Sequence, residues 1–310
     1  MKSKIISIFP LLTVIFINPV SSIWTYEGQW GSSGTGIGQF YTAIDVTIAT
    51  NGKVYVTDWD TCRVQYFTAT GSYLGQWGSY GTGNGQFYHP LGIDIASNGN
   101  VYVADEYNDR VQYFNASGSY LGQWGTHGSG DGQFMWAAGI DIAPNGNIYV
   151  TDIFNERVQY FTATGSYLGQ WSSSFDHPYN ISIASNGNVY IADYSNYCVK
   201  YFTATGSYLG QWGSFNQPSG LAVAPSGEVY VAEIYENRIR YFTAEGSYLG
   251  QFGSGGSGVG QFSMPRGVGF NNTGSRIYVA DSANHRIQYF NRNEPTVESF
   301  TLGQIRTLFK

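Results

Sequence analysis

The chain has 310 residues and a net charge of −6, from 15 Lys and Arg against 21 Asp and Glu. Only 12% of the residues are charged, whereas 17% are aromatic and 41 are glycine. The aromatic content excludes a disordered chain, and the absence of a Lys- and Arg-rich cluster argues against nucleic acid as a partner. Abundant Gly, Tyr and Trp with little charge favour short strands and tight turns. We therefore expect an all-β protein.

Residues 1–22 have the organisation of an export signal. Lys2 and Lys4 precede a mostly apolar run over residues 5–17, and small residues follow at 20–22. The run is shorter than the ~20 residues that a membrane-spanning helix needs, and two prolines interrupt the segment. The sequence therefore predicts a cleaved signal peptide, no membrane span in the mature chain, and a secreted or cell-surface product.

After this segment, one unit recurs six times. Its most regular landmark is a Tyr-Phe pair, which begins at Tyr66, Tyr113, Tyr160, Tyr201, Tyr241 and Tyr289. In the second copy, alternating residue types over 91–96, 100–105, 110–114 and 119–124 predict four strands. The Asn98-Gly99 dipeptide between the first two is typical of a two-residue hairpin turn. Four antiparallel strands form one blade of a β-propeller, so six units predict six blades.

The two ends of the chain predict how this ring closes. Residues 26–30 read as a fourth strand with no blade before them, and the sixth unit ends after its third strand near Arg292. Residues 299–304 also resemble a fourth strand and could compete for the same place. The loop after residues 26–30 has the length of the loops within the ring, which favours the N-terminal strand. We expect a monomeric propeller over residues 23–292 and a tail over 293–310.

Segments of each unit resemble the NHL repeat. In the second copy they are Pro90, residues 99–105 (GNVYVAD) and residues 108–112 (NDRVQ); the sixth copy has IYVAD at 277–281 and NHRIQ at 284–288. The resemblance covers residues 23–292 and implies a six-bladed β-propeller. It implies little about function, because one scaffold hosts unrelated activities.

A resemblance to one exported relative, the peptidyl-hydroxyglycine amidating lyase, would imply zinc held by histidines in the central cavity. Those histidines follow the proline of the repeat. At these places the present chain has Leu91, Tyr179, Ser219 and Arg266. Zinc needs convergent nitrogen, sulfur or carboxylate ligands, so the lyase mechanism does not carry over.

An acidic residue follows the second strand of every unit. These residues are Asp58, Asp105, Asp152, Asp193, Glu233 and Asp281. An Arg stands five residues later in every unit except the fourth, which has Cys198. We expect each acid to bind backbone donors of its turn and to pair with its own Arg. A ring of ligand-binding carboxylates is the alternative.

Three further acids interrupt the repeat in the innermost strands. Asp45, Asp94 and Asp141 are interpreted as occupying matching positions in the first three units, beside the central channel. Three carboxylates on one side of a channel could hold a hard cation such as Ca²⁺. The alternative is that they bind backbone amides or water. No other cofactor is indicated, and no catalytic residues are assigned.

Aromatic side chains occupy the loops between the second and third strands, where the family repeat usually has small residues. They are Trp59, Tyr107, Phe154, Tyr194 and Tyr235. Aromatic rings around one face suit stacking on sugar rings or contact with a protein. Packing against the neighbouring loop is the alternative.

These features together predict an exported binding scaffold for a protein or glycan ligand rather than an enzyme. A metal-dependent lyase or hydrolase, with its cation at the channel carboxylates, is the alternative. Cys62 and Cys198 lie in opposite blades and are expected to be unpaired. Acceptor sequences at Asn115, Asn180 and Asn271 predict a glycoprotein.

Overall fold

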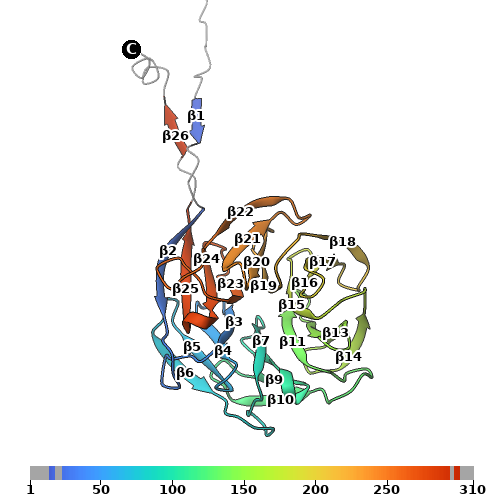
Figure 1. The fold of residues 1–310 in the computed structure, drawn as a ribbon. Helices are drawn as coiled ribbons and strands as arrows, with labels where there is room; N and C mark the ends of the chain where they lie inside the picture. The colour runs from blue at the N-terminus through green and yellow to red at the C-terminus, as the bar shows by residue number, and fades with distance from the viewer. Residues whose placement is uncertain (1–13, 18–22, 294–296, 301–310) are drawn as a thin grey trace, which may run out of the picture. The chain divides into compact units, whose positions relative to one another are not determined.

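The computed structural model describes residues 14–17, 23–293 and 297–300. From Trp24 to Arg292 the strands form six four-stranded antiparallel sheets around a common centre (Figure 1), so the six-bladed propeller is confirmed. Separately, β1 (Val14–Ile17) pairs antiparallel with β26 (Val297–Phe300). The rest of the predicted signal peptide lies outside the described residues, and its cleavage stays a prediction. No helix among the described residues is long and apolar enough to cross a membrane.

Within each blade, the four strands follow one another in order from the ring centre outward. Blade 1 contains β3 (Ala43–Ile48), β4 (Val54–Asp58), β5 (Arg63–Phe67) and β6 (Tyr73–Trp77), and blade 2 contains β7 (Pro90–Ile95), β8 (Val101–Asp105), β9 (Arg110–Phe114) and β10 (Tyr120–Trp124). Blade 3 contains β11 (Ala137–Ile142), β12 (Ile148–Asp152), β13 (Arg157–Phe161) and β14 (Tyr167–Trp171), and blade 4 contains β15 (Pro178–Ile183), β16 (Val189–Asp193), β17 (Cys198–Phe202) and β18 (Tyr208–Trp212). Blade 5 contains β19 (Pro218–Val223), β20 (Val229–Glu233), β21 (Arg238–Phe242) and β22 (Tyr248–Phe252). Blade 6 contains β23 (Pro265–Phe270), β24 (Arg276–Asp281), β25 (Arg286–Arg292) and, outermost, β2 (Trp24–Trp30).

The outermost position of β2 in blade 6 confirms closure by the N-terminal strand. The strand order of that sheet is β2-β25-β24-β23, so the two ends of the repeat region meet in one blade. Short 3₁₀ helices, η1 (Glu106–Asn108) and η2 (Ser282–Asn284), lie in the loops between the second and third strands of blades 2 and 6. We call the end of the ring that carries these loops the loop face.

The repeated Tyr-Phe pair places one ring on each side of its sheet. Tyr113 covers Gly122 of the neighbouring outer strand, where an added Cβ would lie 2.6 Å from the ring. Phe114 is fully buried between blades, 5.5 Å from the ring of Trp77 and 5.6 Å from that of Phe87. The hydrophobic core therefore consists of layers between adjacent blades, and each unit needs its neighbours to bury its apolar faces.

Candidate functional site

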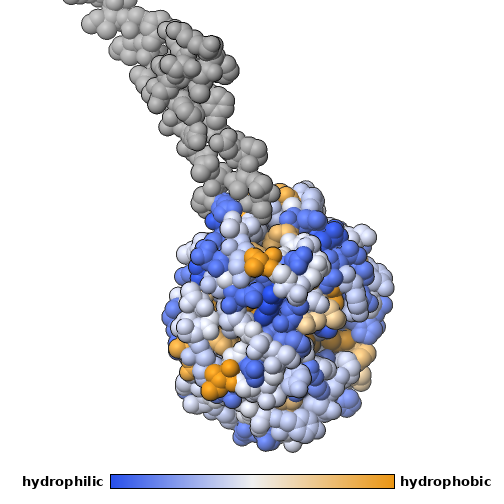
Figure 2. All heavy atoms as spheres, turned by 60° about the vertical axis from the view of Figure 1, so that its left-hand side comes forward, coloured by the Kyte–Doolittle hydropathy of each residue, from blue (hydrophilic) through white to orange (hydrophobic). Residues whose placement is uncertain are grey.

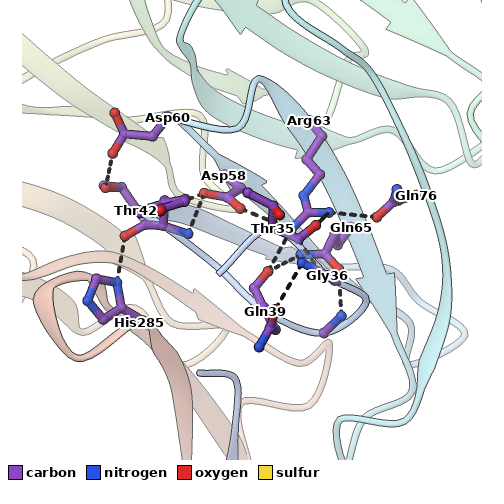
Figure 3. A network of polar contacts seen from close by, with 12 residues as sticks. Thr35, Gly36, Gln39, Thr42, Asp58, Asp60, Arg63, Gln65, Gln76 and His285 are labelled. Atoms are coloured by element: carbon purple, nitrogen blue, oxygen red, sulfur yellow. Dashed lines mark hydrogen bonds and ion pairs between the residues drawn. The ribbon is translucent and has the colours of Figure 1, made fainter. Parts of the chain in front are cut away.

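The acid at the end of each second strand stabilises its own blade. In blade 1, Asp58 Oδ1 accepts hydrogen bonds from the backbone N–H groups of Tyr41 (3.2 Å) and Thr42 (2.9 Å). Arg63 approaches Asp58 to 3.5 Å and donates to the carbonyl of Thr35 at 2.7 Å (Figure 3). Burial raises the pKa of Asp58, and these bonds oppose the rise. The expectation that each acid binds backbone donors of its turn and pairs with the Arg of its blade is thus confirmed in blade 1.

Blade 4 keeps this ion pair with different residues. Lys200 Nζ lies 2.7 Å from Asp193 Oδ2 and supplies the charge that Cys198 lacks. In blade 2 the matching residue is Gln112, whose side chain binds the backbone of the long Gly-rich loop at Gly85. The corresponding loop of blade 4 is shorter, and Lys200 donates instead to carbonyls at residues 173 and 174. A cation therefore replaces the amide where the long loop is missing.

The predicted register of the three channel acids is wrong for Asp45. Asp94 and Asp141 each face the tyrosine of the adjacent second strand, whereas in blade 1 the residue that faces this tyrosine is Thr47. Asp45 lies two residues earlier and faces Thr57. All three acids line a cavity of about 230 Å³ between the innermost strands, but at two different levels.

Each channel carboxylate binds a backbone amide of the next blade. The Oδ2 atoms of Asp45, Asp94 and Asp141 accept hydrogen bonds from the N–H groups of Ile93 (3.1 Å), Ile142 (3.0 Å) and Ile183 (2.8 Å). Burial raises the pKa of Asp45 to about 7, and burial together with the nearby Asp94 raises the pKa of Asp141. Within the described residues no three Asp, Glu, His or Cys side chains are grouped to hold a metal ion. The Ca²⁺ site stays a prediction that this geometry does not support.

Aromatic rings form a continuous series on the loop face from blade 1 to blade 4. The aromatic belt consists of Trp59, His89, Tyr107, Trp136, Phe154 and His177. Trp59 stacks on His89 with ring centroids 3.6 Å apart, and Trp136 lies 4.7 Å from Tyr107 and 4.5 Å from Phe154. Tyr107 contacts both Trp59 and His89, and Phe154 contacts His177. Four blades therefore contribute to one aromatic surface.

The sequence-predicted aromatics differ in how far they reach solvent. Trp59 is partly buried against a small core of Ile44, Leu91 and neighbouring residues, so local packing accounts for much of its surface. Phe154 and Tyr235 keep 44% and 55% of their surface exposed. Figure 2 shows another face of the molecule, on which apolar patches are small and scattered over a mostly hydrophilic surface. Of the five predicted aromatic residues, Phe154 and Tyr235 are therefore the best placed to touch a ligand.

Three polar residues that the sequence did not single out meet at the centre of the loop face. Glu106, Tyr179 and Arg266 come from blades 2, 4 and 6. Trp59 Nε1 donates to Glu106 Oε2 at 2.7 Å, and Arg266 Nη1 donates to the hydroxyl of Tyr179 at 2.9 Å. Glu106 is 4% exposed, and burial raises its pKa to about 7 although Trp59 and Arg266 both favour its charged form. The only sequence signal for this group was that Tyr179 and Arg266 stand at two of the places where the lyase relative has histidines.

Tyr194 and Tyr235 continue the loop face beside this polar group. Tyr194 lies 5.6 Å from Tyr179, and its hydroxyl donates to Gln217 at 2.7 Å. Gln217 belongs to a set of non-glycine residues with left-handed backbone just before the innermost strands of blades 2 to 6: His89, Trp136, His177, Gln217 and Met264, with φ between 53° and 68°. Such strained positions are found at ligand-binding sites, and here they vary in side chain from blade to blade.

The cysteines and acceptor asparagines occupy different environments. Cys62 and Cys198 are buried and unpaired, as predicted. Asn180 is 7% exposed on an innermost strand and faces the channel cavity, which is a poor place for a glycan. Asn115 and Asn271 lie at turns, and their modification stays a prediction.

Comparisons with known proteins give the same fold. A family model described as a 6-bladed beta-propeller matches residues 93–208, and the NHL repeat model matches residues 215–240 and 262–290. No curated protein matches the sequence. The chain is an NHL-repeat six-bladed β-propeller, as the sequence resemblance implied.

Solved structures of similar fold include two lyases and a synthase. A streptogramin B lyase is 15% identical with a TM-score of 0.61, over 91% of this chain and 98% of that one. A catalytically inactive virginiamycin B lyase from Staphylococcus aureus with quinupristin is 14% identical with a TM-score of 0.59, over 94% and 89%. The Kuenenia stuttgartiensis hydrazine synthase is 10% identical with a TM-score of 0.61, over 85% and 99%. At these identities the likeness shows the fold alone.

Proposed function

We propose that this NHL-repeat propeller is a monomeric binding scaffold whose loop face holds a protein or glycan ligand. The observation that carries the proposal is the aromatic belt, which joins four blades and includes the exposed ring of Phe154. The exposed ring of Tyr235 continues the loop face in blade 5. The proposed location, at the cell surface or outside the cell, rests on the predicted signal peptide.

The belt supports binding because its rings are fixed before a ligand arrives. Trp136 holds Phe154 from one side, and His177 contacts it from another. A rigid, exposed ring loses little conformational entropy on binding, so more of the contact energy appears as affinity. Aromatic rings with nearby hydrogen-bonding groups suit both sugar rings and protein side chains.

The lyase or hydrolase alternative lacks a comparable observation. It depends on the channel carboxylates, and these already accept hydrogen bonds from the backbone of the next blade. The similar fold of the two lyases does not supply the missing site, because one propeller scaffold serves unrelated functions.

Array binding with matched variants tests the proposal. The whole chain would be applied to arrays of oligosaccharides and of peptides, beside the double variant Phe154→Ala/Tyr235→Ala. Tyr248→Ala is the control, because Tyr248 is 56% exposed, as Tyr235 is 55% exposed, but lies on the outermost strand of blade 5.

We expect binding that the double variant loses by about tenfold or more and the control retains. The estimate follows from two exposed aromatic contacts worth ~0.5–1.5 kcal/mol each beyond their buried area. An equal loss of affinity in the double variant and in Tyr248→Ala, or no binding to either array, would contradict the proposal.

A further inference from the structure

The loop face carries the positive charge of Arg266, which forms no ion pair with the acid at the end of a second strand. We propose that the ligand of this face is an acidic saccharide whose carboxylate is bound by Arg266. This inference rests on the proposed function and specifies the ligand class.

Arg266 differs from the basic residues that pair with the acid at the end of a second strand. Seven Lys and Arg residues of the described part form ion pairs with the acid of their own blade: Arg63, Arg110, Arg157, Lys200, Arg238, Arg240 and Arg286. Within residues 23–293, Arg266 forms no ion pair, and its side chain makes one hydrogen bond, to Tyr179. A guanidinium has five N–H donors, so most of them remain for a ligand.

Glu106 is the acid that interacts electrostatically with Arg266, but it does not neutralise it by contact. Its Oε2 atom accepts the indole N–H of Trp59, and its side chain is buried. Burial also raises the pKa of Glu106 to about 7, so near neutral pH only part of its charge opposes that of Arg266. A partly exposed cation without an ion pair therefore remains at this place.

The bond between Arg266 and Tyr179 places the guanidinium over the ring centre. Arg266 is the second residue of the innermost strand of blade 6 and Tyr179 the second of that of blade 4, so the 2.9 Å contact crosses the channel mouth past blade 5. The tyrosine hydroxyl fixes one side of the guanidinium. A planar guanidinium held in this way presents paired donors that match the two oxygens of a carboxylate.

The surroundings of Arg266 favour a saccharide over a peptide. Tyr179 and Tyr194 lie 5.6 Å apart beside it, and the exposed Tyr235 follows in the next blade. Sugar rings stack their C–H faces on aromatic rings and offer hydroxyls to polar groups such as Gln217. An extended peptide would instead pair with a free strand edge, and the free edges of this ring are on the outermost strands.

Calorimetric titration of the whole chain tests this proposal. The probes are trigalacturonate against galactotriose, and sialyllactose against lactose, so that each acidic sugar has a neutral counterpart. The variants are Arg266→Gln, Arg266→Lys and the control Lys53→Gln. Lys53 lies in the turn at the opposite end of blade 1, where it contacts the ring of Tyr66. Thermal unfolding of each variant confirms that the ring is folded.

We expect at least one acidic probe to bind ~10-fold or more tighter than its neutral counterpart, as one charge-assisted contact would give. Arg266→Gln should remove this preference, Arg266→Lys should keep part of it, and Lys53→Gln should keep all of it. An unchanged preference in Arg266→Gln would overturn the assignment of Arg266. Equal affinity for acidic and neutral probes, or no saccharide binding, would overturn the ligand class. Neutral binding that depends on Phe154 and Tyr235, or peptide binding on the arrays, would leave the proposed function standing.

Discussion

Replacing Asp45 with Asn should destabilise the protein at acidic pH but not at pH 8. The pKa of Asp45 rises from 3.8 to about 7 on folding because burial penalises the carboxylate. A group with a raised pKa in the folded state stabilises the fold fully below its unfolded pKa, and this contribution is lost as pH rises through the folded pKa. A tenfold change in proton affinity corresponds to ~1.4 kcal/mol, so Asp45 alone should lower the free energy of unfolding by ~4 kcal/mol between pH 4 and pH 8.

The Asn side chain removes this titration but also one acceptor. Asp45 accepts backbone bonds from Val46 (2.9 Å) and Ile93 (3.1 Å), and Asn has a single carbonyl oxygen for both. An unsatisfied buried amide costs ~1–3 kcal/mol. Asp45→Asn should therefore be less stable than the wild type at pH 4.5 and at least as stable at pH 8.

Urea unfolding followed by tryptophan fluorescence at pH values from 4.5 to 8 measures the effect. Asp60→Asn is the control, because Asp60 is an exposed carboxylate in the loop between β4 and β5 of the same blade and does not line the channel cavity. Parallel stability curves for wild type and Asp45→Asn would refute the reasoning, since they would mean that Asp45 has the same proton affinity in the folded and unfolded chain.

Two further predictions concern the blade itself, and thermal and urea unfolding check both. Lys200→Gln leaves the buried Asp193 without a cation and should cost ~3–5 kcal/mol. Adding Cys198→Arg should recover most of this loss by restoring the pairing of the other blades, and no recovery would contradict the exchange of roles. Gly122→Ala should cost ~1–3 kcal/mol because its methyl group meets the ring of Tyr113. The same substitution should cost much less in a Tyr113→Ala background, and an equal cost there would rule out the clash.

The fold was predictable because every blade repeats the same local information. Each copy carries the turn between its first two strands, at least three of the four alternating segments and the Tyr-Phe pair, so an error in one copy is corrected by the other five. Ring closure by β2 was predictable for a different reason. An unpaired edge is unfavourable, and only the N-terminal strand had both the pattern of a fourth strand and a following loop of the right length.

The register of Asp45 shows where local likeness misleads. Ile44-Asp45-Val46 resembles the Ile-Asp-Ile of Asp94, and this likeness predicted matching positions. Hairpin register is set by the turn, however, and a shift by two residues keeps a side chain on the same face. Asn51 stands six positions after Asp45, whereas Asn98 stands four positions after Asp94. Counting back from the Asn-Gly turn would have placed Thr47, and not Asp45, beside Asp94.

The polar centre of the loop face was harder to predict because its members are far apart in sequence and in different blades. Glu106 follows a second strand, whereas Tyr179 and Arg266 are the second residues of innermost strands. In a closed ring, the second residues of all innermost strands lie around one small circle, so any two of them can meet across it. Residues 44, 91, 138, 179, 219 and 266 share this place, and four of them are aliphatic or small. The two large polar residues therefore mark the site, since nothing in the packing of a single blade requires a Tyr or an Arg there.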